Sequence, residues 1–254
     1  MLFVIDVGNT DATLGIYEGE NLRNSFRIPS KRDENAIFFE YKIRDYFLEN
    51  DIKFADIQKI VLSSVVPTLT PIYKEIILRT FGFTPIVVNA NIFPQLKVSI
   101  DNPDEIGSDL VANAVAAFTK YHRNCVVVDF GTALTFTTVS GEGKILGVAI
   151  APGLRTAVKA LFSNTAQLPD VPLELPKSVI GKNTIHSIQA GILWGYEGMV
   201  RSMIRKIRRE LDGDCIAIAT GGLSSIIPTL KGEFKEINVN LTMDGLRIIG
   251  EQSR

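Results

Sequence analysis

Two short segments of the chain combine a carboxylate, a glycine and hydroxyl or amide side chains. The first is Asp6-Val7-Gly8-Asn9-Thr10, and the second is Asp129-Phe130-Gly131-Thr132, about half the chain further on. In both, bulky β-forming residues precede the aspartate, which predicts a buried strand that leads into a tight turn. The N–H groups, hydroxyls and carboxylate of such a turn suit phosphate oxygens and their metal ion. Without a ligand, the same residues would only supply turn geometry.

The surrounding pattern repeats as well. A second strand follows each turn, at residues 12–17 and 134–139, so each segment is predicted to form a β-hairpin. Two such hairpins facing each other would hold a phosphate chain from both sides.

The first half of the sequence predicts a three-stranded meander followed by helices and strands in alternation. A third strand at residues 22–28 precedes a helix at 36–48, whose expected start is Asp33. A strand at 59–65 and a helix at 70–81 follow, with Thr70 as the expected cap and Pro71 in the first turn. A buried strand at 86–88 completes this half.

The second half repeats the hairpin from Cys125 and adds a strand at 144–150 and a short helix after Gly153. Residues 168–182 are too rich in proline for regular structure. A strand at 216–219 leads into Thr220-Gly221-Gly222, and a strand at 236–239 and a helix from Met243 end the chain.

This order is typical of ribonuclease-H-like and actin-like folds. We therefore predict an α/β protein made of two duplicated ribonuclease-H-like subdomains, each a mixed five-stranded sheet flanked by helices. The expected subdomains are residues 1–112 and 113–254.

The longest predicted helix begins after Asn183 and carries two apolar rows. In one row, apolar residues recur every three or four positions, as on the buried face of an amphipathic helix. This row consists of Ile185, Ile188, Ile192, Tyr196, Met199, Met203 and Ile207, and the other consists of Leu193, Val200 and Ile204. Such a helix could pack against a partner chain as well as its own core, or it could be a central helix within one subunit.

Composition narrows the class of protein. The 254 residues are 46% hydrophobic and 22% charged with a formal net charge of −1, which gives no reason to expect nucleic acid or an anionic membrane as a partner. With no basic leader and no apolar run of about 18 residues, we expect a cytoplasmic protein without a membrane span. Cys125 and Cys215 begin apolar strands, where small buried thiols are expected.

Aspartate-glycine hairpins in both halves, followed by a strand that ends in Thr220-Gly221-Gly222, resemble the superfamily of acetate and sugar kinases, heat-shock ATPases and actin. More specifically, the first hairpin, the segment Asn102-Pro103-Asp104-Glu105-Ile106-Gly107-Ser108-Asp109 and the second hairpin are similar, in order, to the signatures of type III pantothenate kinases. Gly181-Lys182-Asn183-Thr184 also matches, so the resemblance covers essentially the whole chain.

The resemblance implies transfer of the γ-phosphate of ATP to the terminal hydroxyl of pantothenate, the first step of coenzyme A biosynthesis. It also implies Mg²⁺, a monovalent cation (K⁺ or NH₄⁺) and a homodimer with the pantothenate site near the subunit interface.

Individual roles follow from the same resemblance. Asp6 would organise the Mg²⁺ ion, and Asp129 would lie near the cation sites of the second hairpin. The implied ATP-binding residues are Asp6, Gly8, Asn9, Thr10, Gly131, Thr132, Gly221 and Gly222. Asp109 is the expected catalytic base, although an acidic residue in the first turn of a helix is also favoured by the helix dipole alone.

The implied substrate-binding residues are Ile100, Gly107, Ser108, Asp109 and Thr184, the last reaching the substrate from the partner subunit. The sequence departs from the family pattern at Leu110, where an arginine usually helps to hold the carboxylate of pantothenate. Loss of that charge-assisted pair, worth roughly 1.5–3 kcal/mol, would weaken substrate binding by one to two orders of magnitude. The alternatives are a non-catalytic, nucleotide-binding homologue with a regulatory role, or a kinase for a less anionic hydroxyl substrate.

Overall fold

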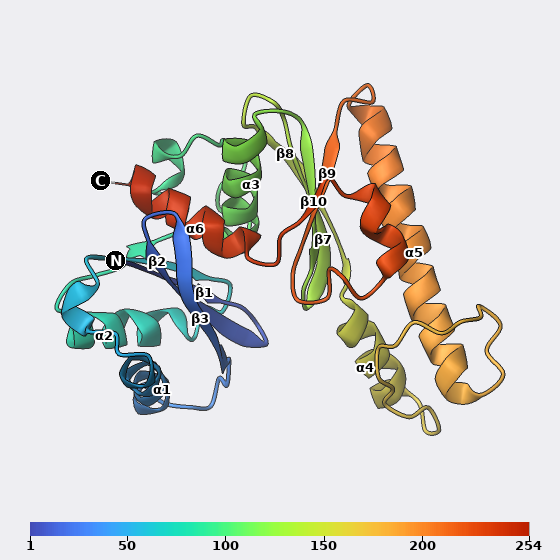
Figure 1. The fold of residues 1–254 in the computed structure, drawn as a ribbon, viewed down its shortest axis with the longest axis horizontal. Coiled ribbons are helices and arrows are strands. Elements are labelled where there is room, and N and C mark those ends of the chain that lie inside the picture. The colour runs from blue at the N-terminus through green and yellow to red at the C-terminus, as the bar shows by residue number, and fades with distance from the viewer. Residues whose placement is uncertain (254) are drawn as a thin grey trace. The chain divides into compact units, whose positions relative to one another are not determined.

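The computed structural model describes residues 1–253, which divide into two compact units. The first comprises residues 1–116 together with the C-terminal residues from 242 on, and the second comprises residues 117–241. Each unit contains one five-stranded sheet with helices packed on it (Figure 1). The predicted α/β class with two mixed five-stranded sheets is confirmed.

The sheet of the first unit has the order β3-β2-β1-β4-β5. Its strands are β1 (Leu2–Val7), β2 (Asp11–Glu18), β3 (Asn21–Pro29), β4 (Lys59–Ser64) and β5 (Ile86–Val87). The first three strands pair antiparallel, as the predicted meander requires, while β4 lies parallel to both β1 and β5. The strand β1, which carries Asp6 near its end, is therefore the middle strand of the sheet.

Two helices, α1 (Ala36–Glu49) and α2 (Thr70–Phe81), cover one face of this sheet. The core there joins Phe3, Ile5 and Val7 of β1 to apolar side chains of both helices, such as Phe39 and Tyr73. Alternation along β1 sends these odd-numbered residues to the helix-covered face and leaves Asp6 on the other.

Both helices begin within the predicted ranges, at Ala36 and Thr70, but both predicted capping residues need correction. Asn35, not Asp33, caps α1, because its side-chain oxygen accepts a hydrogen bond from the N–H of Phe38 at 3.2 Å. Leu69 stands at the N-cap of α2 without a side-chain bond, and the Thr70 hydroxyl instead donates to Ser64 Oγ at 2.8 Å. The N–H of Thr70 bonds to the Val66 carbonyl four residues earlier, so Thr70 is the first residue of the helix and not its cap.

The opposite face of the first sheet carries α3 (Ser108–Tyr121) and the last helix, α6 (Leu241–Gln252). The two helices approach so closely that a Cβ on Gly245 would lie 1.9 Å from the Ala112 carbonyl oxygen. Tyr17 of β2 donates a hydrogen bond to Asp244 at 2.7 Å, which ties α6 to the sheet. The helix begins at Leu241 and not at Met243 as expected.

The second sheet has the order β10-β9-β6-β7-β8. Its strands are β6 (Cys125–Phe130), β7 (Ala133–Val139), β8 (Ile145–Pro152), β9 (Ile216–Thr220) and β10 (Glu236–Ile237). The hairpin β6–β7 is antiparallel and β6 lies parallel to β9, so the pairing of the first sheet is repeated. Strand β10 is shorter than predicted because Asn238 folds into a turn, its Oδ1 accepting from the N–H of Asn240 at 2.9 Å.

The long helix α5 (Thr184–Glu210) packs mainly on its own sheet. Its buried residues Leu193, Tyr196, Val200 and Ile204 belong to the same core as Val126 and Val128 of β6. This part of α5 therefore packs on its own core, as both interpretations of its two apolar rows require. The first turn differs, because residues 184–187 are all exposed.

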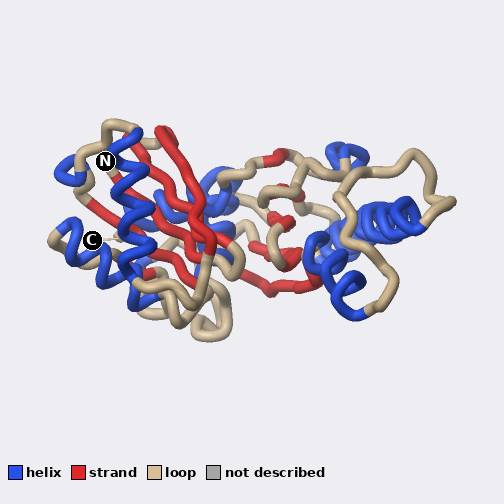
Figure 2. The backbone as a smooth tube through the Cα atoms, turned by 90° about the horizontal axis from the view of Figure 1, so that it is seen from below, coloured by secondary structure: helices blue, strands red, loops and turns tan. Residues whose placement is uncertain are grey.

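A shorter helix, α4 (Leu154–Asn164), precedes α5, and the connection between them has no helix or strand, as the prolines predict. Figure 2 shows this connection as a long tan loop beside the two helices. No helix within residues 1–253 is long and apolar enough to cross a membrane.

Candidate functional site

Asp6 lies near the end of β1 with a hydroxyl residue beside it on each neighbouring strand. Its partners in the sheet register are Thr13 of β2 and Ser63 of β4. Residues opposite each other in a sheet point to the same face, so the three side chains lie side by side. Ser63 Oγ donates a hydrogen bond to Asp6 Oδ1 at 2.8 Å, which orients the half-buried carboxylate.

The same serine connects Asp6 to the start of α3. Ser63 Oγ lies 2.9 Å from Ser108 Oγ, and the N–H of Ser64 donates to Ser108 Oγ at 3.1 Å. Ser63 is fully buried and Ser108 nearly so. The first residue of α3 is thereby fixed against the end of β4.

Asp109 follows Ser108 and is the second carboxylate held in this region. Its Oδ1 accepts a hydrogen bond from the N–H of Leu110 at 2.8 Å. The preceding Gly107 leaves room for it, because a Cβ on that glycine would lie 2.5 Å from Asp109 Oδ1. Burial raises the pKa of Asp109 above its usual range, and hydrogen bonds from the backbone offset part of that rise. A carboxylate with a raised pKa is suited to accept a proton.

The turn between β1 and β2 contains Gly8, Asn9 and Thr10, and the last two are exposed. Arg32, in the loop after β3, donates from Nη2 to Asn9 Oδ1 at 2.7 Å. Because a guanidinium has no acceptor, the amide oxygen of Asn9 must face Arg32, which leaves its NH₂ group as a donor for another ligand. Arg32 also brings a positive charge to the turn.

The second hairpin repeats this arrangement. Asp129, near the end of β6, has Thr135 and Thr220 as its register partners on the neighbouring strands, so hydroxyl residues again lie on both sides of the carboxylate. The turn residues Gly131 and Thr132 are exposed, as in the first hairpin. The repeat seen in the sequence therefore extends to residues on strands that lie far apart along the chain.

Glycines pack closely against the second hairpin. Gly221 has a φ of +89°, and a Cβ there would lie 2.5 Å from Asp129 Oδ1. A Cβ on Gly153 would lie 2.2 Å from the Gly131 carbonyl oxygen. The N–H of Gly153 donates to the Thr132 carbonyl at 3.0 Å, and Thr156 Oγ1 donates to the same carbonyl at 2.6 Å. The segment 153–156 thus holds the Gly131-Thr132 turn in place through hydrogen bonds to the Thr132 carbonyl.

The residues present fit hard cations bound together with phosphate. No group of three or more His, Cys, Asp or Glu side chains within residues 1–253 forms a metal cluster. A magnesium ion on a nucleotide needs only one or two carboxylates besides phosphate oxygens and water. Thr135 Oγ1 and Thr220 Oγ1 are buried on either side of Asp129 without hydrogen-bond partners, and such oxygens suit a cation or a water molecule.

The predicted substrate residues are distributed over both units. Gly107, Ser108 and Asp109 are adjacent, and Ile100 lies in the loop that leads to them. Thr184 begins α5 and lies about 18 Å along the helix axis from Tyr196, whose hydroxyl donates to the Pro152 carbonyl beside the second hairpin. Leu110, 8% exposed, is part of the packed interior.

Sequence reasoning missed three residues of this region, which are Ser63, Arg32 and Gly153. The β1–β4 register that aligns Ser63 with Asp6 is not readable from the chain, although the serine pair at the end of a strand is visible. Arg32 is one of many basic residues and carries no motif. Gly153 belongs to Ala151-Pro152-Gly153, which predicted only a turn.

Comparison with known proteins identifies close relatives. The family model of type III pantothenate kinases matches residues 2–206. The type III pantothenate kinase of Geotalea uraniireducens is 41% identical over 254 residues, which are 100% of this chain and 99% of the relative. That of Moorella thermoacetica is 40% identical over 253 residues, with full coverage of both chains.

Solved structures show the fold at lower identity. A conserved putative Baf family transcriptional activator from Campylobacter jejuni has a TM-score of 0.58 at 20% identity, covering 98% of both chains. A ROK family glucokinase from Streptomyces griseus, in complex with glucose and AMPPNP, has a TM-score of 0.54 at 12% identity, covering 99% of both chains. These likenesses support the architecture of two related α/β units.

We expect Gly153→Ala to disturb the second hairpin, because its Cβ would overlap the Gly131 carbonyl oxygen and push the turn away. The free energy of unfolding should fall by about 1–3 kcal/mol, as for other overpacked sites, and ATP should bind more weakly. Thermal unfolding and calorimetric titration with ATP measure the two effects.

Gly147→Ala is the matched control, since a Cβ on this β8 glycine meets nothing within 4 Å. It should leave ATP binding unchanged. Equal ATP affinity in both variants would show that the close approach of Gly153 has no bearing on the hairpin.

Proposed function

The chain belongs to the type III pantothenate kinase family, and we propose that Asp109 positions the hydroxyl of pantothenate for attack on the γ-phosphate of ATP. The reaction yields 4′-phosphopantothenate, at the first step of coenzyme A biosynthesis. The observation that supports Asp109 is its place beside Ser108, which Ser63 links to the carboxylate of Asp6 through two hydrogen bonds. The base and the nucleotide hairpin are thus held in one rigid arrangement of β1, β4 and α3.

The two hairpins bind the phosphates of ATP in this proposal. Backbone N–H groups at Gly8 and Gly131, the NH₂ of Asn9 and the hydroxyls of Thr10 and Thr132 are the donors. Arg32 keeps the Asn9 amide in its donor orientation, because Arg32 itself occupies the amide oxygen. Gly221 and Gly222 form a turn without side chains beside Asp129, which allows the adenosine to approach the backbone.

Asp6 is the proposed ligand, directly or through water, of a Mg²⁺ ion bound to the phosphates. When bound, such an ion neutralises charge on the phosphate oxygens. The Ser63 hydroxyl donates to one carboxylate oxygen of Asp6 and so fixes the direction of the other.

A monovalent cation, K⁺ or NH₄⁺, is proposed at Asp129. Support comes from the two buried hydroxyls of Thr135 and Thr220, which flank Asp129 in the register and have no other hydrogen-bond partner. Oxygen donors of this kind are the ligands that such cations prefer.

Asp109 has two tasks in phosphoryl transfer. It accepts a hydrogen bond from the attacking hydroxyl, which aligns the oxygen with the phosphorus, and it takes the proton as the new bond forms. In a loose transition state the bond from the attacking oxygen to phosphorus is only slightly formed, so little positive charge develops on the hydroxyl. Alignment by Asp109 therefore contributes more than proton abstraction.

Leu110 occupies the position at which the resemblance leads us to expect an arginine. A leucine side chain has neither a charge nor a hydrogen-bond donor, and Leu110 is also buried, so in this proposal pantothenate is held by Thr184 and other groups. A non-catalytic homologue that binds only nucleotide is the alternative that this residue favours.

We also propose a homodimer formed through the start of α5. A groove of about 400 Å³ lies between α4 and α5 and is lined by Leu161, Leu168, Thr184, Ser187, Ile188, Gly191 and Ile192. Nearby apolar side chains are exposed, among them Ile180 (77%) and Ile185 (47%). The distance of Thr184 from its own hairpin supports a contact with the substrate of the partner subunit. The two buried, unpaired cysteines support a cytoplasmic location.

Asp109→Asn should lower kcat/KM by roughly 10²–10⁴-fold while making the protein more stable near neutral pH. The stability gain follows from the raised pKa of Asp109, because the ionised carboxylate destabilises the fold above that pKa and the amide does not. The difference in unfolding free energy between wild type and variant should shrink as the pH falls and Asp109 of the wild type takes up its proton.

Steady-state kinetics and chemical denaturation across pH 4–8 measure both effects, since that range begins near the usual pKa of about 3.9 for aspartate. Asp104→Asn, an exposed change in the preceding loop, is the control. Full activity of the Asp109→Asn variant would show that the Asp109 carboxylate is not required for catalysis.

Purified protein with ATP, Mg²⁺ and K⁺ should convert pantothenate to phosphopantothenate, and omission of the monovalent cation should lower the rate. The Leu110→Arg variant should lower the KM for pantothenate if its guanidinium reaches the carboxylate, by one to two orders of magnitude for roughly 1.5–3 kcal/mol. An inactive wild type with an active Leu110→Arg variant, together with calorimetric binding of nucleotide but not pantothenate, would establish the non-catalytic alternative.

Ile185→Asp should shift the protein from dimer to monomer, because it places a charge in the proposed apolar interface. Sedimentation velocity gives the mass directly. Ile37→Asp makes the same change at a 69% exposed position on α1 and should leave the dimer intact. A monomeric wild type, or a dimer that persists in Ile185→Asp, would contradict this interface.

A further inference from the structure

A second cavity, of about 690 Å³, lies at the C-terminal end of α5 within the second unit. Its lining consists of Arg201, Arg205, Arg208, Arg209, Asp212, Gly213 and Glu233. Four guanidinium groups thus face two carboxylates, an excess of positive charge in a protein whose formal net charge is −1. The proposed kinase mechanism uses none of these residues.

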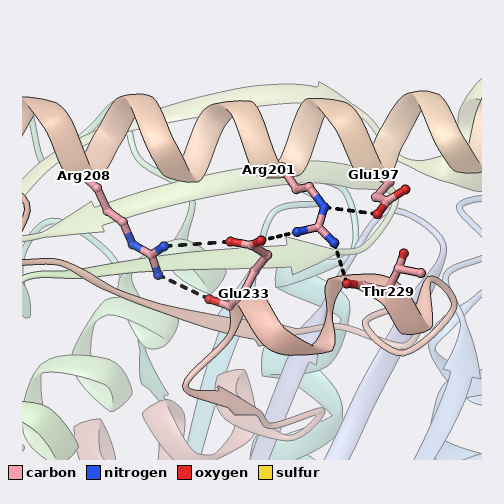
Figure 3. A network of polar contacts seen from close by, with 5 residues as sticks. All are labelled: Glu197, Arg201, Arg208, Thr229 and Glu233. Carbon is pink, nitrogen blue, oxygen red and sulfur yellow. Dashed lines mark hydrogen bonds and ion pairs between the residues drawn. The ribbon is translucent and has the colours of Figure 1, made fainter.

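Two of the four arginines are already engaged, as Figure 3 shows. Arg201 donates from Nε to Glu197 at 3.1 Å and from Nη2 to the Thr229 carbonyl at 2.7 Å, and it forms an ion pair with Glu233. Arg208 donates to the carbonyls of Cys215 and Glu233, at 3.1 and 3.3 Å, and its Nη1 lies 3.8 Å from the Glu233 carboxylate. These two side chains thus connect α5 to the segment 228–233 on one side of the cavity.

The other two arginines have no such partners. Within residues 1–253, neither Arg205 nor Arg209 makes an ion pair or a side-chain hydrogen bond, and both are exposed at the cavity. Their spacing of four residues places them one above the other on the same face of the helix. Of the two acids that line the cavity, Glu233 pairs with Arg201 and Arg208, and Asp212 makes no ion pair with either guanidinium within the described residues.

Stabilisation of the helix end explains only part of this cluster. Cations in the last turn of a helix interact favourably with its dipole, which accounts for Arg208 and Arg209. The effect falls off within one turn, so it does not account for Arg205. Nor does it account for a cavity onto which both unpaired guanidinium groups open.

We propose that this cavity binds the phosphate or pyrophosphate group of a small phosphorylated molecule. Guanidinium groups form paired, charge-assisted hydrogen bonds with phosphate oxygens, and two of them at adjacent positions match a group with several oxygens. The volume falls in the range of small-ligand sites and exceeds the needs of a bare phosphate ion. The lining has no aromatic ring, so the phosphate rather than a nucleobase is the recognised part.

The cavity is distinct from the nucleotide-binding hairpin. It lies where α5 leads into the start of β9, whereas Asp129 lies beside Thr220 at the other end of that strand. Five residues of β9 separate the two edges by about 15 Å. The segment 228–233, which Arg201 holds through Thr229 and Glu233, is separated from the Gly221-Gly222 turn by residues 223–227.

The test is calorimetric titration of pyrophosphate into the full-length protein saturated with AMPPNP and Mg²⁺, which occupies the nucleotide site. Wild type should bind about one further pyrophosphate per chain, more weakly at high ionic strength. The double variant Arg205→Ala/Arg209→Ala should bind it roughly tenfold more weakly or not at all. Both substitutions are at exposed positions, and thermal unfolding confirms that the variant is folded.

Lys206→Ala is the matched control, because it removes an exposed cation from the same helix turn outside the cavity lining. It should leave pyrophosphate binding unchanged. Absence of binding to the nucleotide-saturated wild type would overturn the proposal, and so would equal binding by wild type and the double variant or equal loss in Lys206→Ala. A failure of AMPPNP to bind would instead contradict the kinase assignment, and titration of the nucleotide-free proteins would then decide on the cavity.

Discussion

The hydrogen bonds that join Asp6, Ser63 and Ser108 are the constraint on which the first half of the site depends. The carboxylate near the end of the central strand is oriented by the Ser63 hydroxyl, and the first turn of α3 is joined to the sheet through Ser108 Oγ, which also accepts from the N–H of Ser64. Ser63 thus connects both groups with a single buried hydroxyl, because it donates to Asp6 Oδ1 and lies 2.9 Å from Ser108 Oγ. Buried polar groups of this kind are costly unless every one is paired, so the arrangement tolerates little variation.

The second half of the site achieves a similar order by different means. There, close approach of the backbone replaces hydrogen-bonded serines, since Gly221 and Gly153 lie against Asp129 and the Gly131-Thr132 turn. The hydroxyls of Thr135 and Thr220 remain unpaired beside the carboxylate. The hydroxyls of Ser63 and Ser108 beside the first hairpin therefore pair within the chain, whereas the second hairpin has two hydroxyl oxygens available for a cation.

The sequence predicts the elements well because each hairpin carries its own local signal. Buried runs ending in Asp6 and Asp129, prolines in the α4–α5 connection and the amphipathic pattern of α5 all act over a few residues. The helix caps are less predictable, since Asn35 and Asp33 are chemically similar and only the backbone path decides between them. The contacts of Ser63 and Arg32 depend on strand register and loop position, which no local pattern encodes, and the sequence alone could not reveal them.

The last helix, α6, belongs to the unit formed by the first residues of the chain. Glycines allow its close packing, because Met243 lies against Gly15 of β2, Gly250 against Val61 of β4 and Gly245 against Ala112 of α3. The first unit is therefore closed by contacts of long sequence separation, such as the hydrogen bond from Tyr17 to Asp244 across 227 positions. Contacts of this kind slow folding, because a long loop must close before they form, so we expect the first unit to fold more slowly than its local hairpins alone would.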